Sequence, residues 1–166
     1  QQPSGNSRNR ASDGGGPLYD IGCYAILSGC LLFKGEPEVL SASAIMSHNN
    51  DIEKQVDAIL RWPNGETLSF TVSGDAALCQ TYTVLGSNGW ANLDVPINPP
   101  EETHAYWSKG GLQYSNKVEF PCCNHYKLMV DDFVSLSKSG QESDFSISKS
   151  VTKAINDIQK IAGLTI

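Results

Sequence analysis

The sequence predicts an α+β fold, in which helices pack on one face of a single, mainly antiparallel β-sheet. Three observations support this prediction. Residues 17–33 show helical spacing of apolar side chains, tight-turn signals join strand-like segments in the middle of the chain, and two further helical segments follow. We expect the 166 residues to form one domain with its own core, and residues 1–13 to form a polar loop or linker.

The first predicted helix begins at Pro17, because proline fits the first turn of a helix, where its missing N–H costs nothing. Apolar side chains recur at roughly helical steps, at Leu18, Ile21, Ala25, Leu27, Leu31 and Leu32. Gly35 and Pro37 are expected to end the helix. Three glycines, at positions 14–16, precede it and allow backbone conformations that other residues avoid, as well as a close approach to a ligand.

The middle of the chain has the periodicity of strands. Strands are expected over residues 39–47, 52–62, 67–73, 80–85, 90–95 and 112–120. Tight-turn signals at residues 63–66 and 86–89 predict two hairpins, and residues 96–104 are expected to form a loop. Successive hairpins imply antiparallel pairing. Since strands rich in apolar and aromatic residues would leave one sheet face uncovered, we expect a homo-oligomer through that face.

Two helices are expected in the last third of the chain. Asn124 is a suitable N-cap for the first helix, and Tyr126 begins its broad apolar face. The second helix has apolar side chains at steps of three and four, at Ile147, Val151, Ile155, Ile158 and Ala162. Gly163 is expected near its C-terminal cap.

Composition narrows the classes of function. A net charge of -6 argues against binding to nucleic acid or to an anionic membrane, and no apolar run approaches the ~20 residues that span a bilayer. Five cysteines, with Cys122 and Cys123 adjacent, suit neither routine disulfides nor a metal site, so reduced thiols in a cytoplasmic protein are expected. A periplasmic or secreted location stays open, because the sequence begins at Gln1 without a methionine.

Asp20 and Tyr24 are four residues apart, so they lie one turn apart on the same face of the predicted helix. A carboxylate and a phenol placed in this way can bring two proton-handling groups to one ligand. An ordinary helix start with a half-buried tyrosine has the same spacing, and the spacing alone favours this simpler interpretation.

The residues around this pair favour the interpretation as two proton-handling groups over the simpler one. The segment from Gly14 to Tyr24, preceded by residues 6–9, resembles the start of the C-terminal domain of the glucose–fructose oxidoreductase, inositol dehydrogenase and rhizopine-catabolism (Gfo/Idh/MocA) oxidoreductases. The resemblance continues through residues 35–39, 63–66, 86–90 and 124–133, in the order of the family and over nearly the whole chain. It implies the α+β fold of a dihydrodipicolinate-reductase-like C-terminal domain.

The resemblance also implies a function. Family members pair this domain with an N-terminal Rossmann domain, which is absent from this chain and binds NAD or NADP. Hydride then passes between the nicotinamide and a sugar, a polyol or a related alcohol. A lysine of the Rossmann domain works beside an Asp-x-x-x-His or Asp-x-x-x-Tyr pair, which corresponds here to Asp20 and Tyr24 as the catalytic residues.

The tyrosine resembles the glucose–fructose oxidoreductase, xylose dehydrogenase and dihydrodiol dehydrogenase branch. Because the ordinary pKa of a phenol is near ~10, such a group needs a nearby cation, which the lysine would supply, to exchange protons at neutral pH. By the same resemblance Asp20 orients the lysine or a substrate hydroxyl. The isolated domain is therefore expected to be inactive.

Five further residues are candidates for contacts with the substrate or the cofactor. Arg8, Asn9, Gly15 and Gly16 lie in or just before the glycine turn, and His125 begins a helix that borders the substrate pocket in the family. Two alternatives to the enzyme are a non-catalytic family member and a stand-alone α+β domain, each acting as a binding or oligomerisation module. The chain has no G-x-G-x-x-G dinucleotide fingerprint, which agrees with a cofactor held mainly elsewhere.

Overall fold

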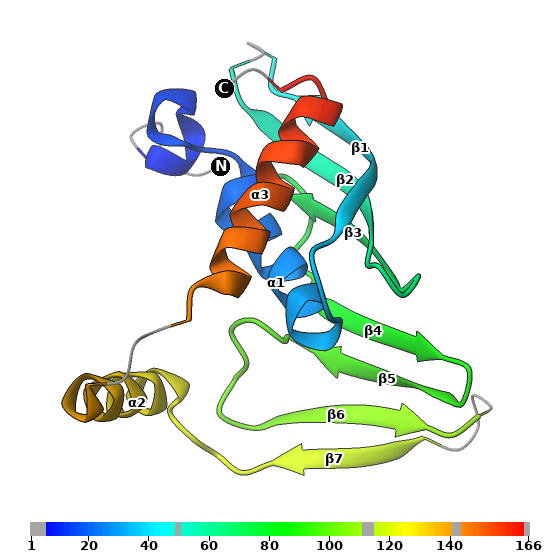
Figure 1. The fold of residues 1–166 in the computed structure, drawn as a ribbon, viewed down its shortest axis with the longest axis vertical. Coiled ribbons are helices and arrows are strands. Elements are labelled where there is room, and N and C mark those ends of the chain that lie inside the picture. Colours follow the sequence, from blue (N-terminus) through cyan, green and yellow to red (C-terminus); the bar gives the residue numbers. More distant parts are fainter. Residues whose placement is uncertain (1–5, 49–50, 111–114, 141–143, 165–166) are drawn as a thin grey trace. The chain divides into compact units, whose positions relative to one another are not determined.

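The computed structural model describes residues 6–48, 51–110, 115–140 and 144–164 (Figure 1). The chain divides into two compact units, one made of residues 1–76 and 144–166 and the other of residues 77–143. The α+β class with antiparallel strands is confirmed. In place of the single expected sheet, the described strands pair in two separate sheets.

The first unit contains a three-stranded sheet with the order β1-β2-β3. Its strands are β1 (Glu38–Met46), β2 (Glu53–Arg61) and β3 (Thr67–Ser73), close to the predicted bounds. The predicted turn between β2 and β3 is confirmed, because the N–H of Trp62 donates to Glu66 O at 2.8 Å and the N–H of Gly65 donates to Trp62 O at 2.9 Å. Gly65 has a φ of +97°, which favours glycine at this position.

Helices α1 (Cys23–Leu32) and α3 (Ser146–Ile161) pack together on one face of this sheet (Figure 1). The core between them contains six fully buried large side chains: Trp62, Leu18, Ile26, Leu60, Ile158 and Val56. Gly163, just after α3, has a left-handed φ of +68°, as a glycine that ends a helix does. The predicted helix that begins near Pro17 is present, with one local difference described below.

The expected loop over residues 1–13 is more regular than predicted. Two short 3₁₀ helices, η1 (Ser7–Asn9) and η2 (Ala11–Asp13), occupy most of its described part. Asn6 caps η1, because its side chain accepts a hydrogen bond from the N–H of Arg8 at 3.0 Å. Residues 1–5 lie outside the described residues.

The second unit contains the other sheet, with the order β4-β5-β6-β7. Its strands are β4 (Thr81–Gly86), β5 (Gly89–Asp94), β6 (Thr103–Ser108) and β7 (Asn116–Phe120). The hairpin of β4 and β5 is confirmed. Strand β6 was not predicted, because the proline and glutamate residues before it suggested a continuing loop. Residues 74–80 form no strand, and β4 pairs with β5, so the two sheets do not join within the described chain.

Helix α2 (His125–Ser139) also belongs to the second unit. As predicted, Asn124 caps it, with Oδ1 accepting from the N–H of Lys127 at 3.0 Å. Its apolar side chains are exposed; Phe133, for example, is 71% exposed. None of the helices in the described residues is long and apolar enough to cross a membrane.

Candidate functional site

The candidate site that the sequence predicts, with Asp20 and Tyr24, lies at the start of the first long helix. This helix begins with a π-helical turn, η3 (Leu18–Gly22), and continues as α1. Asp20 lies in this π turn and Tyr24 in the first turn of α1, so the two side chains lie about one helical turn apart along the helix. Short π segments are rare and occur frequently at functional sites.

Both side chains are accessible. The Asp20 side chain is 35% exposed and Tyr24 is 41% exposed. Between them, burial raises the pKa of the Cys23 thiol, so the thiol stays protonated and is a poor nucleophile at neutral pH. The chemistry on this face of the helix is thus that of a carboxylate and a phenol.

Arg8 contacts Asp20 directly. Its Nε lies 2.9 Å from Asp20 Oδ1, and its carbonyl oxygen accepts a hydrogen bond from the N–H of Gly16 at 2.9 Å. The carbonyl oxygen of Gly16 in turn accepts from the N–H of Asp20 at 3.2 Å. These three contacts form a closed ring through the side chains and backbone of three residues. The sequence placed Arg8 near the site, and the structure shows that its partner is the carboxylate.

Glu53, at the start of β2, also supports the site and was not foreseen. It is buried, and its Oε1 accepts a hydrogen bond from the N–H of Leu18 at 3.2 Å. A Cβ on Gly16, whose φ is +111°, would lie within 3.0 Å of three atoms of the Glu53 carboxylate. The glycine is needed because the carboxylate occupies this space. A buried glutamate distant in sequence leaves no local pattern, because Glu53 stands among other polar residues at the start of β2.

The other candidates in the turn have partners within the chain. The N–H of Gly15 donates to Arg10 O at 2.9 Å, and a Cβ on Gly15 would collide with the carbonyl oxygens of Arg8 and Arg10. The N–H of Asn9 donates to Asn6 O at 3.0 Å. The structure therefore gives both glycines that the motif singled out, Gly15 and Gly16, an internal role in shaping the turn.

The phenol before Asp20 ties the turn to the rest of the unit. Tyr19 Oη donates to Oε1 of the buried Gln159 on α3, at a distance of 3.4 Å. The π turn is thus held from β2 through Glu53 and from α3 through Gln159. Two elements of the sheet-and-helix core fix the position of the segment that carries Asp20.

His125 lies on α2, in the second unit, where it is exposed and its ring stacks on Tyr126 with centroids 4.2 Å apart. Among the described residues, no group of three or more His, Cys, Asp and Glu side chains could hold a metal ion. Two surface cavities, of about 380 and 390 Å³, lie elsewhere in the first unit and are lined by neither Asp20 nor Tyr24. The candidate site is therefore the accessible helix surface that carries Asp20 and Tyr24, and neither of these cavities.

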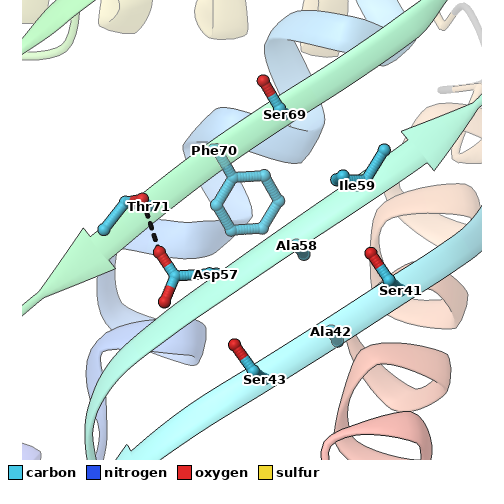
Figure 2. Close-up of a pocket in the computed structure, with 9 residues that line it drawn as sticks. All are labelled: Ser41, Ala42, Ser43, Asp57, Ala58, Ile59, Ser69, Phe70 and Thr71. Atoms are coloured by element: carbon cyan, nitrogen blue, oxygen red, sulfur yellow. Dashed lines mark hydrogen bonds between the residues drawn. The ribbon is translucent and has the colours of Figure 1, made fainter.

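One of these two cavities lies on the three-stranded sheet and is lined by residues of β1, β2 and β3 (Figure 2). Ser43 and Thr71 lie on either side of Asp57, which accepts a hydrogen bond from the Thr71 hydroxyl at 2.6 Å, and Ser41 and Ser69 lie on either side of Ile59. This face is therefore more polar than expected from the sequence for an uncovered sheet face, because serine and threonine occupy most of its positions on β1 and β3.

Comparison with known proteins gives the class of this domain. The family profile described as the GFO/IDH/MocA C-terminal domain matches residues 1–92. This match spans more than half of the 166 residues, so the chain belongs to the GFO/IDH/MocA family of oxidoreductases. The resemblance seen in the sequence is confirmed.

Individual relatives agree with this class. A trans-1,2-dihydrobenzene-1,2-diol dehydrogenase of Bos taurus is 37% identical over 98 residues, which cover 57% of this chain and 29% of the relative. A dTDP-3,4-didehydro-2,6-dideoxy-alpha-D-glucose 3-reductase of Streptomyces antibioticus is 27% identical over 141 residues, 84% of this chain and 42% of the relative. The chain spans about half the length, or less, of the curated relatives that it matches.

The fold is shared with a solved structure, a 3-ketoreductase from Actinomadura kijaniata in complex with NADP and TDP-benzene. The TM-score is 0.85 at 21% identity, and the match covers 96% of this chain and 50% of that one. At this identity the similarity shows the fold.

Proposed function

We propose that this chain is the substrate-side domain of an NAD(P)-dependent oxidoreductase that acts on a sugar, a polyol or a related alcohol. The observation that carries the proposal is the accessible pair of Asp20 and Tyr24 on one continuous helical segment, with Arg8 paired to the Asp20 carboxylate. Membership of an oxidoreductase family supports it, as does a relative named as a sugar-nucleotide reductase.

In this proposal Tyr24 is the acid–base group. Its phenol exchanges a proton with the hydroxyl or carbonyl oxygen of the substrate, at the carbon where the nicotinamide cofactor takes up or delivers hydride. A lysine of an N-terminal Rossmann domain supplies the nearby cation that a phenol needs for this task. Asp20 orients that lysine or a substrate hydroxyl.

The proposal assigns the dinucleotide mainly to the Rossmann domain. Helix starts bind phosphate when glycine N–H groups point at the ligand. Here the N–H groups of Gly15 and Gly16 donate to Arg10 and Arg8 within the same turn. This chain's own contribution is to present Asp20 and Tyr24 to the reacting carbon of the substrate.

The test is a pair of tyrosine variants in the full-length protein. Tyr24→Phe should lower kcat roughly 10²- to 10⁴-fold, the range of a lost general acid–base group, while cofactor binding and Tm stay unchanged. The comparison variant is Tyr19→Phe, which removes a phenol from the same turn and loses only the hydrogen bond to Gln159 that helps to hold the turn, so it should lower kcat far less than Tyr24→Phe. Unchanged turnover in Tyr24→Phe would show that the assigned role is wrong.

A second test concerns the gene. The sequence upstream of Gln1 should encode a strand, a glycine-rich turn and a helix, followed by a lysine motif. Without them the dehydrogenase proposal fails, and the binding-module alternative takes its place.

An assembly role is favoured by a separate observation. In the second sheet, Val84, Leu93, Ala105 and Val118 fall on one face, because the register places Leu93 opposite Ala105 and Ala105 opposite Val118. Val118 and Phe120 of this face are exposed. We propose that the homo-oligomer expected from the sequence forms through this sheet; light scattering that finds only a monomer would contradict it.

A further inference from the structure

Arg8 is a candidate contact for substrate or cofactor by its place in the sequence. In the structure its Nε is directed at Asp20 Oδ1, 2.9 Å away. Its backbone carbonyl holds the N–H of Gly16, and Gly16 holds the N–H of Asp20. The same arginine therefore contacts the carboxylate through its side chain and supports the backbone of Asp20 through one intermediate residue.

We infer that Arg8 is a positioning residue, which fixes the orientation of the Asp20 carboxylate and acts on the reaction only through it. This inference rests on the proposed function of Asp20 and Tyr24. An aspartate on an exposed turn has several staggered rotamers, and a planar guanidinium with fixed N–H directions selects among them. Catalysis depends on such selection, because misplacing a group by about 1 Å can cost ~10²-fold in rate.

The ion pair is suited to orientation rather than to stability. The Arg8 side chain is 55% exposed, and ion pairs between exposed side chains add little to the free energy of folding. A variant that breaks the pair should therefore leave the fold and Tm almost unchanged. This separates an effect on turnover from an effect on folding.

The same loop offers a matched control. Arg10 forms an ion pair with Asp13, three residues along, and not with Asp20. Arg8→Gln and Arg10→Gln thus remove the same charge from the same loop, and only the first releases Asp20. In the full-length protein we expect Arg8→Gln to lower kcat tenfold or more, with KM changed less than about twofold, as an oriented group's loss predicts. Arg10→Gln should match the wild type, and Arg8→Lys should recover part of kcat.

A double-mutant cycle with Asp20→Asn tests whether Arg8 acts through the carboxylate. If it does, Arg8→Gln causes no further loss of kcat in the Asp20→Asn background. A rise in KM with kcat unchanged, or two losses that multiply, would overturn the inference, because Arg8 would then contact substrate or act independently. So would a loss of kcat that follows a fall in Tm. If Tyr24→Phe and Asp20→Asn both keep full turnover, it is the proposed function that fails. These two variants are therefore measured before any Arg8 variant, so that the two failures can be told apart.

Discussion

An alanine at position 16 would test the packing that supports the site. Its methyl group would lie within 3.0 Å of three atoms of the buried Glu53 carboxylate, and its backbone would have to keep a φ of +111°. A left-handed conformation costs an L-residue about 1–2 kcal/mol. Moving Glu53 aside would also remove its hydrogen bond from the N–H of Leu18, and a bond to a charged group contributes about 1.5–3 kcal/mol. We expect Gly16→Ala to lower the free energy of unfolding by roughly 3–5 kcal/mol.

The matched control is Gly14→Ala. Gly14 also has a left-handed φ, +69°, but no atom lies within 4 Å of the place where its Cβ would be. Its cost should be only the conformational one, about 1–2 kcal/mol. Urea denaturation followed by circular dichroism measures both variants. At about 2–4 °C per kcal/mol for a chain of this size, Tm should fall about two to three times further for Gly16→Ala. Equal losses of unfolding free energy in the two variants would refute the reasoning, because the close approach of Glu53 to Gly16 would then add nothing to the cost of the substitution.

Two further predictions concern titratable groups. Burial raises the pKa of the Cys23 and Cys30 thiols, whereas Cys79 is exposed, so iodoacetamide at neutral pH should label Cys79 before Cys23 and Cys30, as followed by peptide mass spectrometry; equal rates for the three would contradict this order. Hydrogen bonds from Thr71 and then Gln55 hold the pKa of Asp57 below its ordinary value, so the stability that Asp57 contributes is present above pH ~4 and is lost as the pH falls through the folded-state value. The unfolding curves of the wild type and Thr71→Val should therefore converge in acid; a constant difference at every pH would count against the Thr71 hydrogen bond.

The fold was largely predictable because its signals are local. Strands β1 to β5 and the three long helices were found from periodicity, and the turn at Gly65 and the cap at Asn124 from residues with one strong local preference. Strand β6 was missed because its six residues show no clear alternation of apolar and polar side chains and follow a segment rich in glutamate and proline. The division into two sheets also left no signal, since pairing between β3 and β4 depends on how residues 74–80 fold rather than on either strand.

The site was predictable only in part, for a related reason. Asp20 and Tyr24 share one helix, so spacing and family motif place them together. The contact between Arg8 and Asp20 depends on two 3₁₀ turns, and the polar residues that form them show no periodicity from which these turns could be predicted. Glu53 reaches the site from another strand, and no pattern around position 53 indicates that its carboxylate fills the space left by Gly16. The contacts that could not be predicted were thus those between residues far apart in the sequence.

The second unit begins after β3 and ends before α3, so it interrupts a core that is already complete without it. All the buried residues of that core, from Leu18 to Ile158, belong to the first unit. Residues 77–143 are therefore inserted into a unit whose core is formed by the residues on either side of them. A truncation after residue 76 would remove α3 with its buried Val151, Ile155 and Ile158, and would expose the rest of the core to water.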